Sequence, residues 1–288
     1  MVAAQLELSF IASNRAATVR ERFRDATLKP VGRRLGQHFL SRRSILDRIA
    51  RVACAGLPGG EAPLTIEIGP GKGALTTPLL DVASKVIAIE VDPYLVHYLR
   101  QKFAAVLEAG RLELIEGDVL KADLTAFGPA VIVGNLPYYI TSPILEKVFA
   151  MGGRWRRAVF LVQAEVAARL AASPGSRDYG YLTVQTQLGS RPENLFEVPR
   201  TAFRPAPKVD SAVIRLEPRD AFAELQLPDK GKFLDFVAAC FRQKRKTLRN
   251  NLAPIYGRER MDAMEEGRLR AEQLSLPEFA ALYRRLHP

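Results

Sequence analysis

The feature that most constrains the fold is an alternation of short apolar runs with amphipathic stretches, starting at Leu64. The five runs are Leu64–Ile68, Val86–Ile89, Leu112–Ile115, Val131–Val133 and Val159–Val162. Runs this short and apolar are typical of strands buried on both faces, and the segments between them are typical of covering helices. The sequence therefore predicts an α/β fold whose mostly parallel sheet carries helices on both faces.

The pattern changes after residue 176. Two further runs, Tyr181–Leu188 and Val209–Leu216, predict additional antiparallel strands on either side of the proline-broken segment Val198–Pro207. From Asp229 onward, apolar residues follow the i, i+3, i+4 spacing of a helix with one buried face. We expect an N-terminal extension over residues 1–30, a catalytic domain over 31–219 and a small all-α domain over 220–288.

Charge narrows the class of partner. The formal net charge is +11 and the pI is near 9.9, a balance that attracts polyanions. Nucleic acid is favoured over a membrane surface, because the chain has no apolar run of membrane length and begins Met-Val. The two cysteines, Cys54 and Cys240, form no metal or disulfide motif, so we expect a cytoplasmic protein without a metal site.

A glycine-rich segment, Glu67-Ile-Gly69-Pro-Gly71-Lys-Gly73, follows the first predicted strand and opens a predicted helix. Such a loop lets the backbone approach a cofactor, although a tight turn without a ligand has the same pattern. Glu90 ends the next strand, where a carboxylate can accept both hydroxyls of a ribose. NAD would suit that position too, but the Gly-x-Gly-x-Gly spacing lacks the pyrophosphate pattern, which favours S-adenosylmethionine.

Asp118 follows the third predicted strand and could accept a hydrogen bond from the adenine amine of this cofactor. The alternative for Asp118 is an Asx turn or a helix N-cap. Because the carboxyl ends of parallel strands meet at one edge of a sheet, the glycine loop, Glu90 and Asp118 are expected to share one crevice.

The motif Asn135-Leu136-Pro137-Tyr138 follows the fourth strand. The Asn135 side-chain oxygen and the Leu136 carbonyl can accept hydrogen bonds from the two N–H groups of an aromatic amine. These contacts favour a tetrahedral nitrogen in the transition state. Pro137 fixes the turn, and Tyr138 offers a ring for stacking on a base. The alternative is an ordinary strand-ending turn.

Five motifs in this order resemble the ribosomal RNA adenine N6-dimethyltransferases, and more closely the small-subunit (16S) enzymes than the antibiotic-resistance relatives that act on large-subunit RNA. They are Leu35-Gly-Gln-His-Phe-Leu40, Glu67-Ile-Gly-Pro-Gly-Lys-Gly-Ala-Leu-Thr76, Asn135-Leu-Pro-Tyr138, Phe203-Arg-Pro-Ala-Pro-Lys-Val-Asp-Ser-Ala212 and Arg245-Lys-Thr-Leu-Arg-Asn-Asn-Leu252. The resemblance covers residue 33 to the C-terminus. It implies a Rossmann-like methyltransferase fold that dimethylates two adjacent adenosines in the 3′-terminal hairpin loop of 16S ribosomal RNA, with a role in small-subunit biogenesis.

The resemblance also implies roles for individual residues. The implied cofactor contacts are Gln37, His38, Leu40, Glu67, Gly69, Gly71, Glu90, Asp118 and Asn135. Phe203 and Tyr138 are implied to sandwich the target adenine, whereas the alternative for Phe203 is an anchor that packs its loop against the core. Residues 1–30 precede the family's motifs and are open to three interpretations: a disordered tail, an accessory RNA arm or an overlong start.

A cluster of basic residues near the C-terminus predicts phosphate contacts from one face of a helix. Its members are Arg242, Lys244, Arg245, Lys246 and Arg249. A solvated helix face is the alternative for such a run. Arg154, Arg156 and Arg157 form another candidate basic patch.

Two rival functions remain. A DNA or large-subunit RNA adenine methyltransferase would share the chemistry, although such DNA enzymes more often carry two prolines after the Asn. A non-enzymatic assembly factor could keep the fold, but this chain retains the complete set of expected cofactor and catalytic positions. We expect a monomeric enzyme.

Overall fold

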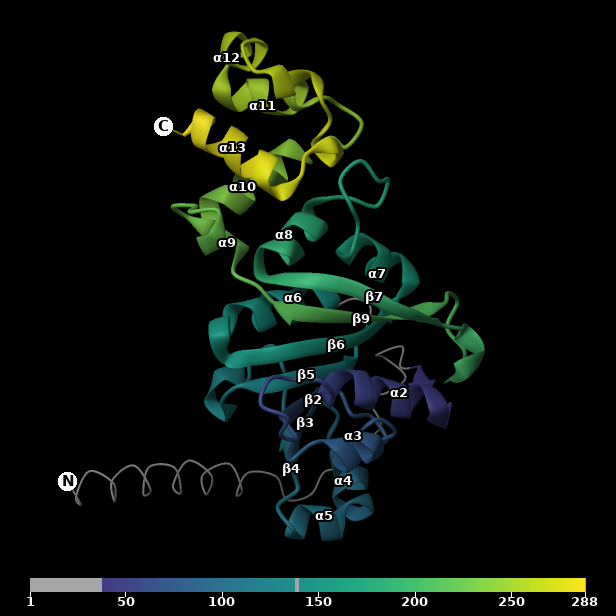
Figure 1. The fold of residues 1–288 in the computed structure, drawn as a ribbon. Helices are drawn as coiled ribbons and strands as arrows, with labels where there is room; N and C mark the ends of the chain where they lie inside the picture. The colour runs from purple at the N-terminus through teal and green to yellow at the C-terminus, as the bar shows by residue number, and fades with distance from the viewer. Residues whose placement is uncertain (1–37, 138–139, 288) are drawn as a thin grey trace, which may run out of the picture.

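A seven-stranded sheet forms the centre of the computed structural model, which describes residues 38–137 and 140–287 (Figure 1). The strand order is β4-β3-β2-β5-β6-β9-β7. The parallel strands are β2 (Leu64–Ile68), β3 (Lys85–Glu90), β4 (Leu112–Glu116), β5 (Ala130–Asn135) and β6 (Trp155–Gln163). Strand β9 (Ser211–Pro218) pairs antiparallel with both β6 and β7 (Ser190–Val198). The predicted α/β fold with a mostly parallel sheet is confirmed.

Helices cover both faces of the sheet, because the strand side chains that point to either face are apolar. Val86 and Ala88 of β3 face one hydrophobic cluster, whereas Ile87 and Ile89 face the other. The first cluster is covered by α2 (Arg43–Cys54), α3 (Thr76–Val82) and α4 (Pro93–Lys102), and α5 (Ala104–Glu108) follows α4. The second is covered by α6 (Thr141–Ala150) and α7 (Ala164–Leu170).

The C-terminal region is helical, as predicted. Its helices are α9 (Ala221–Glu224), α10 (Lys230–Cys240), α11 (Leu248–Tyr256), α12 (Arg258–Asp262) and α13 (Leu276–Leu286). They surround a third hydrophobic cluster, in which the ring of Phe233 meets that of Tyr283 edge-on at 5.4 Å. This cluster also contains Val184 and Leu188, which precede the expected boundary at residue 220.

The prediction of a strand over Tyr181–Leu188 is wrong, because this segment forms helix α8 (Tyr181–Gly189). In the first turn of the helix, the Thr183 hydroxyl accepts a hydrogen bond from the Gly180 N–H and donates one to the Arg169 carbonyl. Most of α8 is buried against both the sheet domain and the C-terminal region. Its sequence therefore shows no polar face, and its β-branched residues mimic a buried strand.

The prediction that the basic residues near the C-terminus lie on one helix is also wrong. Residues 241–246 form turns, and α11 begins only at Leu248, with the Thr247 side chain accepting from the Asn250 N–H. Buried Asn251 holds the turns by accepting from the Gln243 N–H and donating to the Cys240 carbonyl. We call the exposed residues Arg242, Lys244, Arg245 and Lys246 the basic turn.

Arg157 does not belong to a surface patch. Its side chain is buried, and its Nε donates to Glu217 at 2.7 Å. Its Nη1 donates to the carbonyls of Val52 and Ala55, at the end of α2. A buried guanidinium with these partners fastens α2 to the sheet.

No helix in the described part of the chain combines the length and apolarity that a bilayer crossing needs.

Candidate cofactor and substrate site

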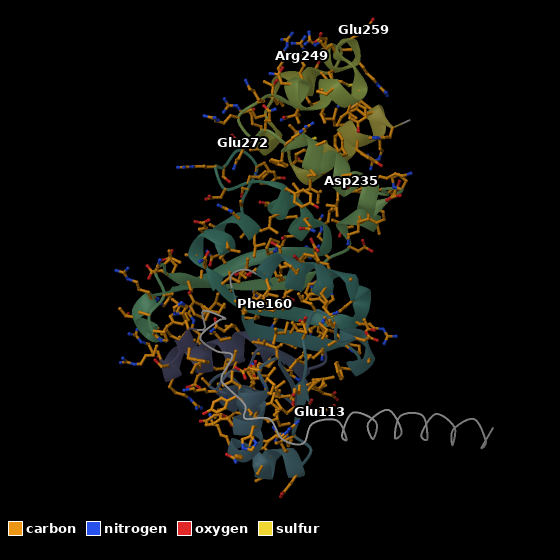
Figure 2. All side chains as sticks on the ribbon, turned by 180° about the vertical axis from the view of Figure 1, so that it is seen from behind. Glu113, Phe160, Asp235, Arg249, Glu259 and Glu272 are labelled. Atoms are coloured by element: carbon orange, nitrogen blue, oxygen red, sulfur yellow. The ribbon has the colours of Figure 1, made fainter. Side chains whose placement is uncertain are left out.

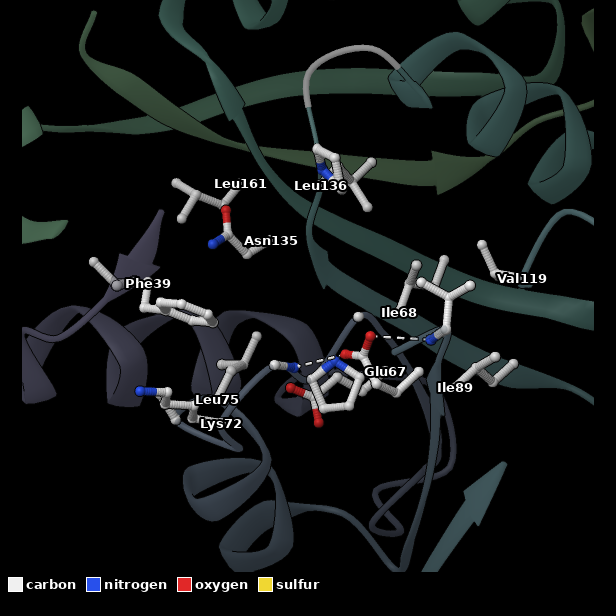
Figure 3. A pocket seen from close by; sticks show the side chains of 18 of the residues that line it. Phe39, Glu67, Ile68, Lys72, Leu75, Ile89, Val119, Asn135, Leu136 and Leu161 are labelled. Atoms are coloured by element: carbon white, nitrogen blue, oxygen red, sulfur yellow. Dashed lines mark hydrogen bonds between the residues drawn. The ribbon is translucent and has the colours of Figure 1, made fainter. Parts of the chain in front are cut away.

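A cavity of about 520 Å³ lies at the carboxyl ends of β2, β3 and β5 (Figure 3). Its walls combine the glycine loop after β2 with the ends of the neighbouring strands and the segment before α2. Every predicted cofactor residue among the described ones lines it: His38, Leu40, Glu67, Gly69, Gly71, Glu90, Asp118 and Asn135. Gln37 lies outside the described residues.

The glycine loop needs its glycines for conformation and for space. Gly69 and Gly71 have φ angles of +65° and +59°, a left-handed region that disfavours side chains. A Cβ on Gly71 would lie 2.9 Å from the Phe39 ring, so that ring packs directly on the loop. A Cβ on Gly69 would meet nothing within 4 Å, which leaves the backbone at this wall of the cavity open to a ligand.

Glu90 ends β3, and its side chain is buried at the cavity wall. Its Oε2 accepts from the Gly71 N–H at 3.0 Å, and its Oε1 accepts from the N–H groups of Val91 and Asp92, each at 3.0 Å. Burial raises the pKa of Glu90, and these backbone donors oppose the rise. A carboxylate has about four acceptor sites, so Glu90 can also accept from a ligand hydroxyl. The sequence did not reveal that Glu90 also fixes the glycine loop.

Glu67 is a second buried carboxyl group at the cavity. Burial raises its pKa to about 7, and the Glu90 charge adds to the rise. The Thr76 hydroxyl, which donates to Glu67 Oε2 at 2.6 Å, opposes it. Lys102, on α4, donates to the carbonyl of Lys72 in the glycine loop at 2.8 Å. The site is therefore rich in buried acceptors.

Asp118 forms the Asx turn that was its alternative, and its hydrogen bond with the cofactor stays a prediction. Its Oδ1 accepts from the Leu120 N–H at 2.9 Å, which makes an Asx turn, and the residue also lines the cavity. The turn therefore presents the carboxylate at the cavity.

The Asn135 side chain lies at the end of β5, with its nitrogen on the Phe39 side in Figure 3. Its Nδ2 donates to the His38 carbonyl at 3.1 Å. Since a carbonyl oxygen can only accept a hydrogen bond, Nδ2 must be the amide atom that faces it. Oδ1 then points away from His38 and is free to accept from another group. Leu136 and Pro137 line the cavity, and Tyr138 lies outside the described residues.

The segment before α2 closes one side of the cavity. Strand β1 (Phe39–Leu40) pairs antiparallel with β8 (Phe203–Arg204), and the Ser41 N–H donates to the Ala202 carbonyl at 2.9 Å. His38 Nδ1 lies 2.9 Å from the Pro205 carbonyl oxygen. The loop after β7 and the wall of the cofactor cavity are thus joined.

The expected stacking role of Phe203 is not supported by its position. The side chain is 3% exposed and packs in the first hydrophobic cluster, and it does not line the cavity. The pairing with Leu40 turns Phe203 inward, so its ring has no free face for a base. Phe203 is the loop anchor that was its alternative.

The basic turn lies on the C-terminal region, apart from the cavity. Lys244 donates to the Arg177 carbonyl and lies 4.0 Å from a Glu272 oxygen. Figure 2 labels Arg249, which lies on α11 in the C-terminal region. It forms an ion pair with Asp262, so its charge is partly compensated. Over the described ranges, no group of His, Cys, Asp or Glu residues is suited to a metal ion.

Comparisons with known proteins place the chain in a family. The family model "Ribosomal RNA adenine dimethylase" matches residues 31–286. A protein named ribosomal RNA small subunit methyltransferase A from Xanthomonas campestris pv. campestris (strain 8004) is 44% identical over 88% of this chain and 95% of its own length. The protein of the same name from Acidobacterium capsulatum is 42% identical over 88% and 90%.

Two solved structures extend the comparison to the fold. A dimethyladenosine transferase from Plasmodium falciparum has a TM-score of 0.71 and 26% identity, covering 86% of this chain and 97% of its own. The 23S rRNA methyltransferase ErmE has a TM-score of 0.65 and 30% identity, covering 87% and 100%. On the family match and the identity to these relatives, the chain belongs to the ribosomal RNA adenine dimethylase family.

Proposed function

We propose that this RNA adenine methyltransferase uses S-adenosylmethionine to dimethylate the N6 amines of two adjacent adenosines in the 3′-terminal hairpin loop of 16S ribosomal RNA. The observation that carries the proposal is the Asn135 amide, held by the His38 carbonyl at the rim of a cavity rich in carboxylates. The 44% identity to small-subunit relatives, against 30% to ErmE, favours the small subunit as the substrate.

The residues of the cavity fit this cofactor. Its volume of about 520 Å³ lies within the range of small-molecule sites. Glu67, Glu90 and Asp118 offer acceptors, which suit the hydroxyls and amines of S-adenosylmethionine better than the phosphates of a dinucleotide. The open backbone at Gly69 allows close approach.

When bound, S-adenosylmethionine supplies an electrophilic methyl group. Asn135 Oδ1 and the Leu136 carbonyl accept hydrogen bonds from the N–H groups of the adenine amine, two before the first methyl transfer and one before the second, and draw its lone pair out of the ring system. Each transfer releases one proton from the amine to solvent. Removing one such transition-state contact costs on the order of 2–4 kcal/mol. Phe39, Leu40 and Leu46 form an apolar part of the cavity wall.

The basic turn contributes phosphate contacts that hold the RNA without reading its sequence. Arg249 contributes less than these residues, because Asp262 compensates its charge. The protein acts as a monomer in the cytoplasm, on the RNA of small ribosomal subunits during their biogenesis.

The test is to incubate the protein with undermethylated small subunits, large subunits and DNA in parallel, with labelled cofactor. We expect two adjacent N6,N6-dimethyladenosines near the 3′ end of 16S RNA, and mass analysis of digested RNA would locate them. Label confined to 23S RNA or DNA would refute the substrate assignment. Absence of label with every substrate, in a protein that binds the cofactor, would refute the activity.

A further inference from the structure

Asn135 can act only if its amide is held in one of two orientations. Its Nδ2 faces the His38 carbonyl at 3.1 Å, and rotation of the amide by 180° would place two acceptor oxygens against each other. The position of the His38 carbonyl therefore decides which atom of Asn135 meets the substrate.

The backbone of His38 lies just beyond the regular pairing of β1 with β8. Phe39 pairs with Arg204 and Leu40 with Phe203, so the next step of this register would pair His38 with Pro205. Proline has no N–H and cannot extend the pairing as a donor. The regular pairing of β1 with β8 therefore ends next to the His38 carbonyl.

The His38 ring makes a contact beyond this end of the pairing. Its Nδ1 lies 2.9 Å from the Pro205 carbonyl oxygen, and since this oxygen can only accept, Nδ1 carries the proton. The ring thus joins the loop after Phe203 to the carbonyl that orients Asn135. We infer that His38 is a positioning residue, whose side chain, through Pro205, holds the Asn135 amide in the orientation that accepts from the adenine amine; this inference rests on the proposed function.

Three substitutions separate this role from simple packing. In His38→Asn, the side-chain Nδ2 stands at the same number of bonds from the backbone as histidine Nδ1 and can donate to the Pro205 carbonyl. In His38→Asp, the shape is nearly that of Asn, but an ionised carboxylate would face a carbonyl with no proton between them. His38→Ala removes the contact. His97→Ala, at an exposed position of α4, is the matched control.

We expect His38→Asn to keep kcat within about threefold, whereas His38→Ala and His38→Asp should lose about ten- to a hundredfold in kcat, the range that misplacement of reacting groups produces. The assays hold S-adenosylmethionine at saturation, so a change in its Kd at this residue of the cavity wall does not enter kcat. The KM for RNA and the melting temperature should stay close to those of the parent. His97→Ala should behave as the parent.

A readout independent of activity is the side-chain amide signal of Asn135 in a two-dimensional nitrogen–proton NMR spectrum, assigned by its disappearance in Asn135→Ala. We expect it to shift and to exchange faster with water in His38→Ala and His38→Asp, and to be restored in His38→Asn. Equal activity of the Asn, Asp and Ala variants, or an unmoved Asn135 signal, would overturn the inference. A parent protein that binds the cofactor but methylates nothing would instead refute the proposed function.

Discussion

The most direct quantitative prediction concerns Glu67, which is fully buried beside a second carboxylate. Its folded-state pKa of about 7 stands against an ordinary value of 4.5. The folded protein therefore binds the Glu67 proton more tightly than the unfolded chain does. This contribution to stability is fully present below pH 4.5 and is lost as pH rises to about 7. At about 1.4 kcal/mol per pH unit, the 2.5-unit difference amounts to about 3 kcal/mol.

Glu67→Gln isolates this effect, because glutamine keeps the size and can still accept from the Thr76 hydroxyl. In urea unfolding at a series of pH values, we expect the variant to match the parent near pH 4.5. It should exceed the parent by up to about 3 kcal/mol above pH 7. Glu113→Gln, in an exposed ion pair with Lys85, is the control and should show no such growth across this window. A stability difference between Glu67→Gln and the parent that does not grow with pH would refute the reasoning.

Three further outcomes follow from the site. Asn135→Ala should lower kcat by about a hundredfold or more while RNA affinity, measured by filter binding, is retained; activity within tenfold of the parent would contradict the mechanism. Phe203→Leu should keep near-full turnover, whereas Phe203→Ala should lose about 3–5 kcal/mol of stability in thermal or urea unfolding; a Phe203→Leu variant that is folded but inactive would revive the stacking role. Replacing the basic turn with alanines should flatten the dependence of log K on log salt by up to about 0.7 per charge on single-stranded RNA, with Arg249→Ala changing it less; an unchanged slope would return the turn to a solvated surface.

Local patterns were sufficient to predict the five parallel strands and the acceptors that line the cavity, but not β7 (Ser190–Val198). Glu90, Asp118 and Asn135 each end or follow a parallel strand, and the carboxyl ends of parallel strands meet at one edge of the sheet. The C-terminal helices were predictable because the spacing of Phe233, Phe236 and Val237 marks one apolar face.

What could not be predicted depends on contacts between distant segments. Helix α8 is buried almost all around, so neither alternation nor a polar face distinguishes it from a strand. Phe203 sits in a motif that suggested stacking, yet its direction follows from pairing with Leu40, more than a hundred and sixty residues earlier. The same holds for Arg157, whose acceptors lie at the end of α2.

Several departures from local rules lie at the cavity. Gly69 and Gly71 adopt left-handed backbone, and Glu67 and Glu90 are carboxyl groups removed from water. Burial of the two carboxyl groups costs stability in the ligand-free protein, and a sheet edge that only had to fold would not need both of them at a cavity wall. Backbone donors to Glu90 and the Thr76 hydroxyl at Glu67 offset part of that cost without removing the acceptors from the cavity wall. A ligand that carries positive charge and hydroxyl donors would offset the rest, which is why this edge of the sheet is better explained by binding than by folding.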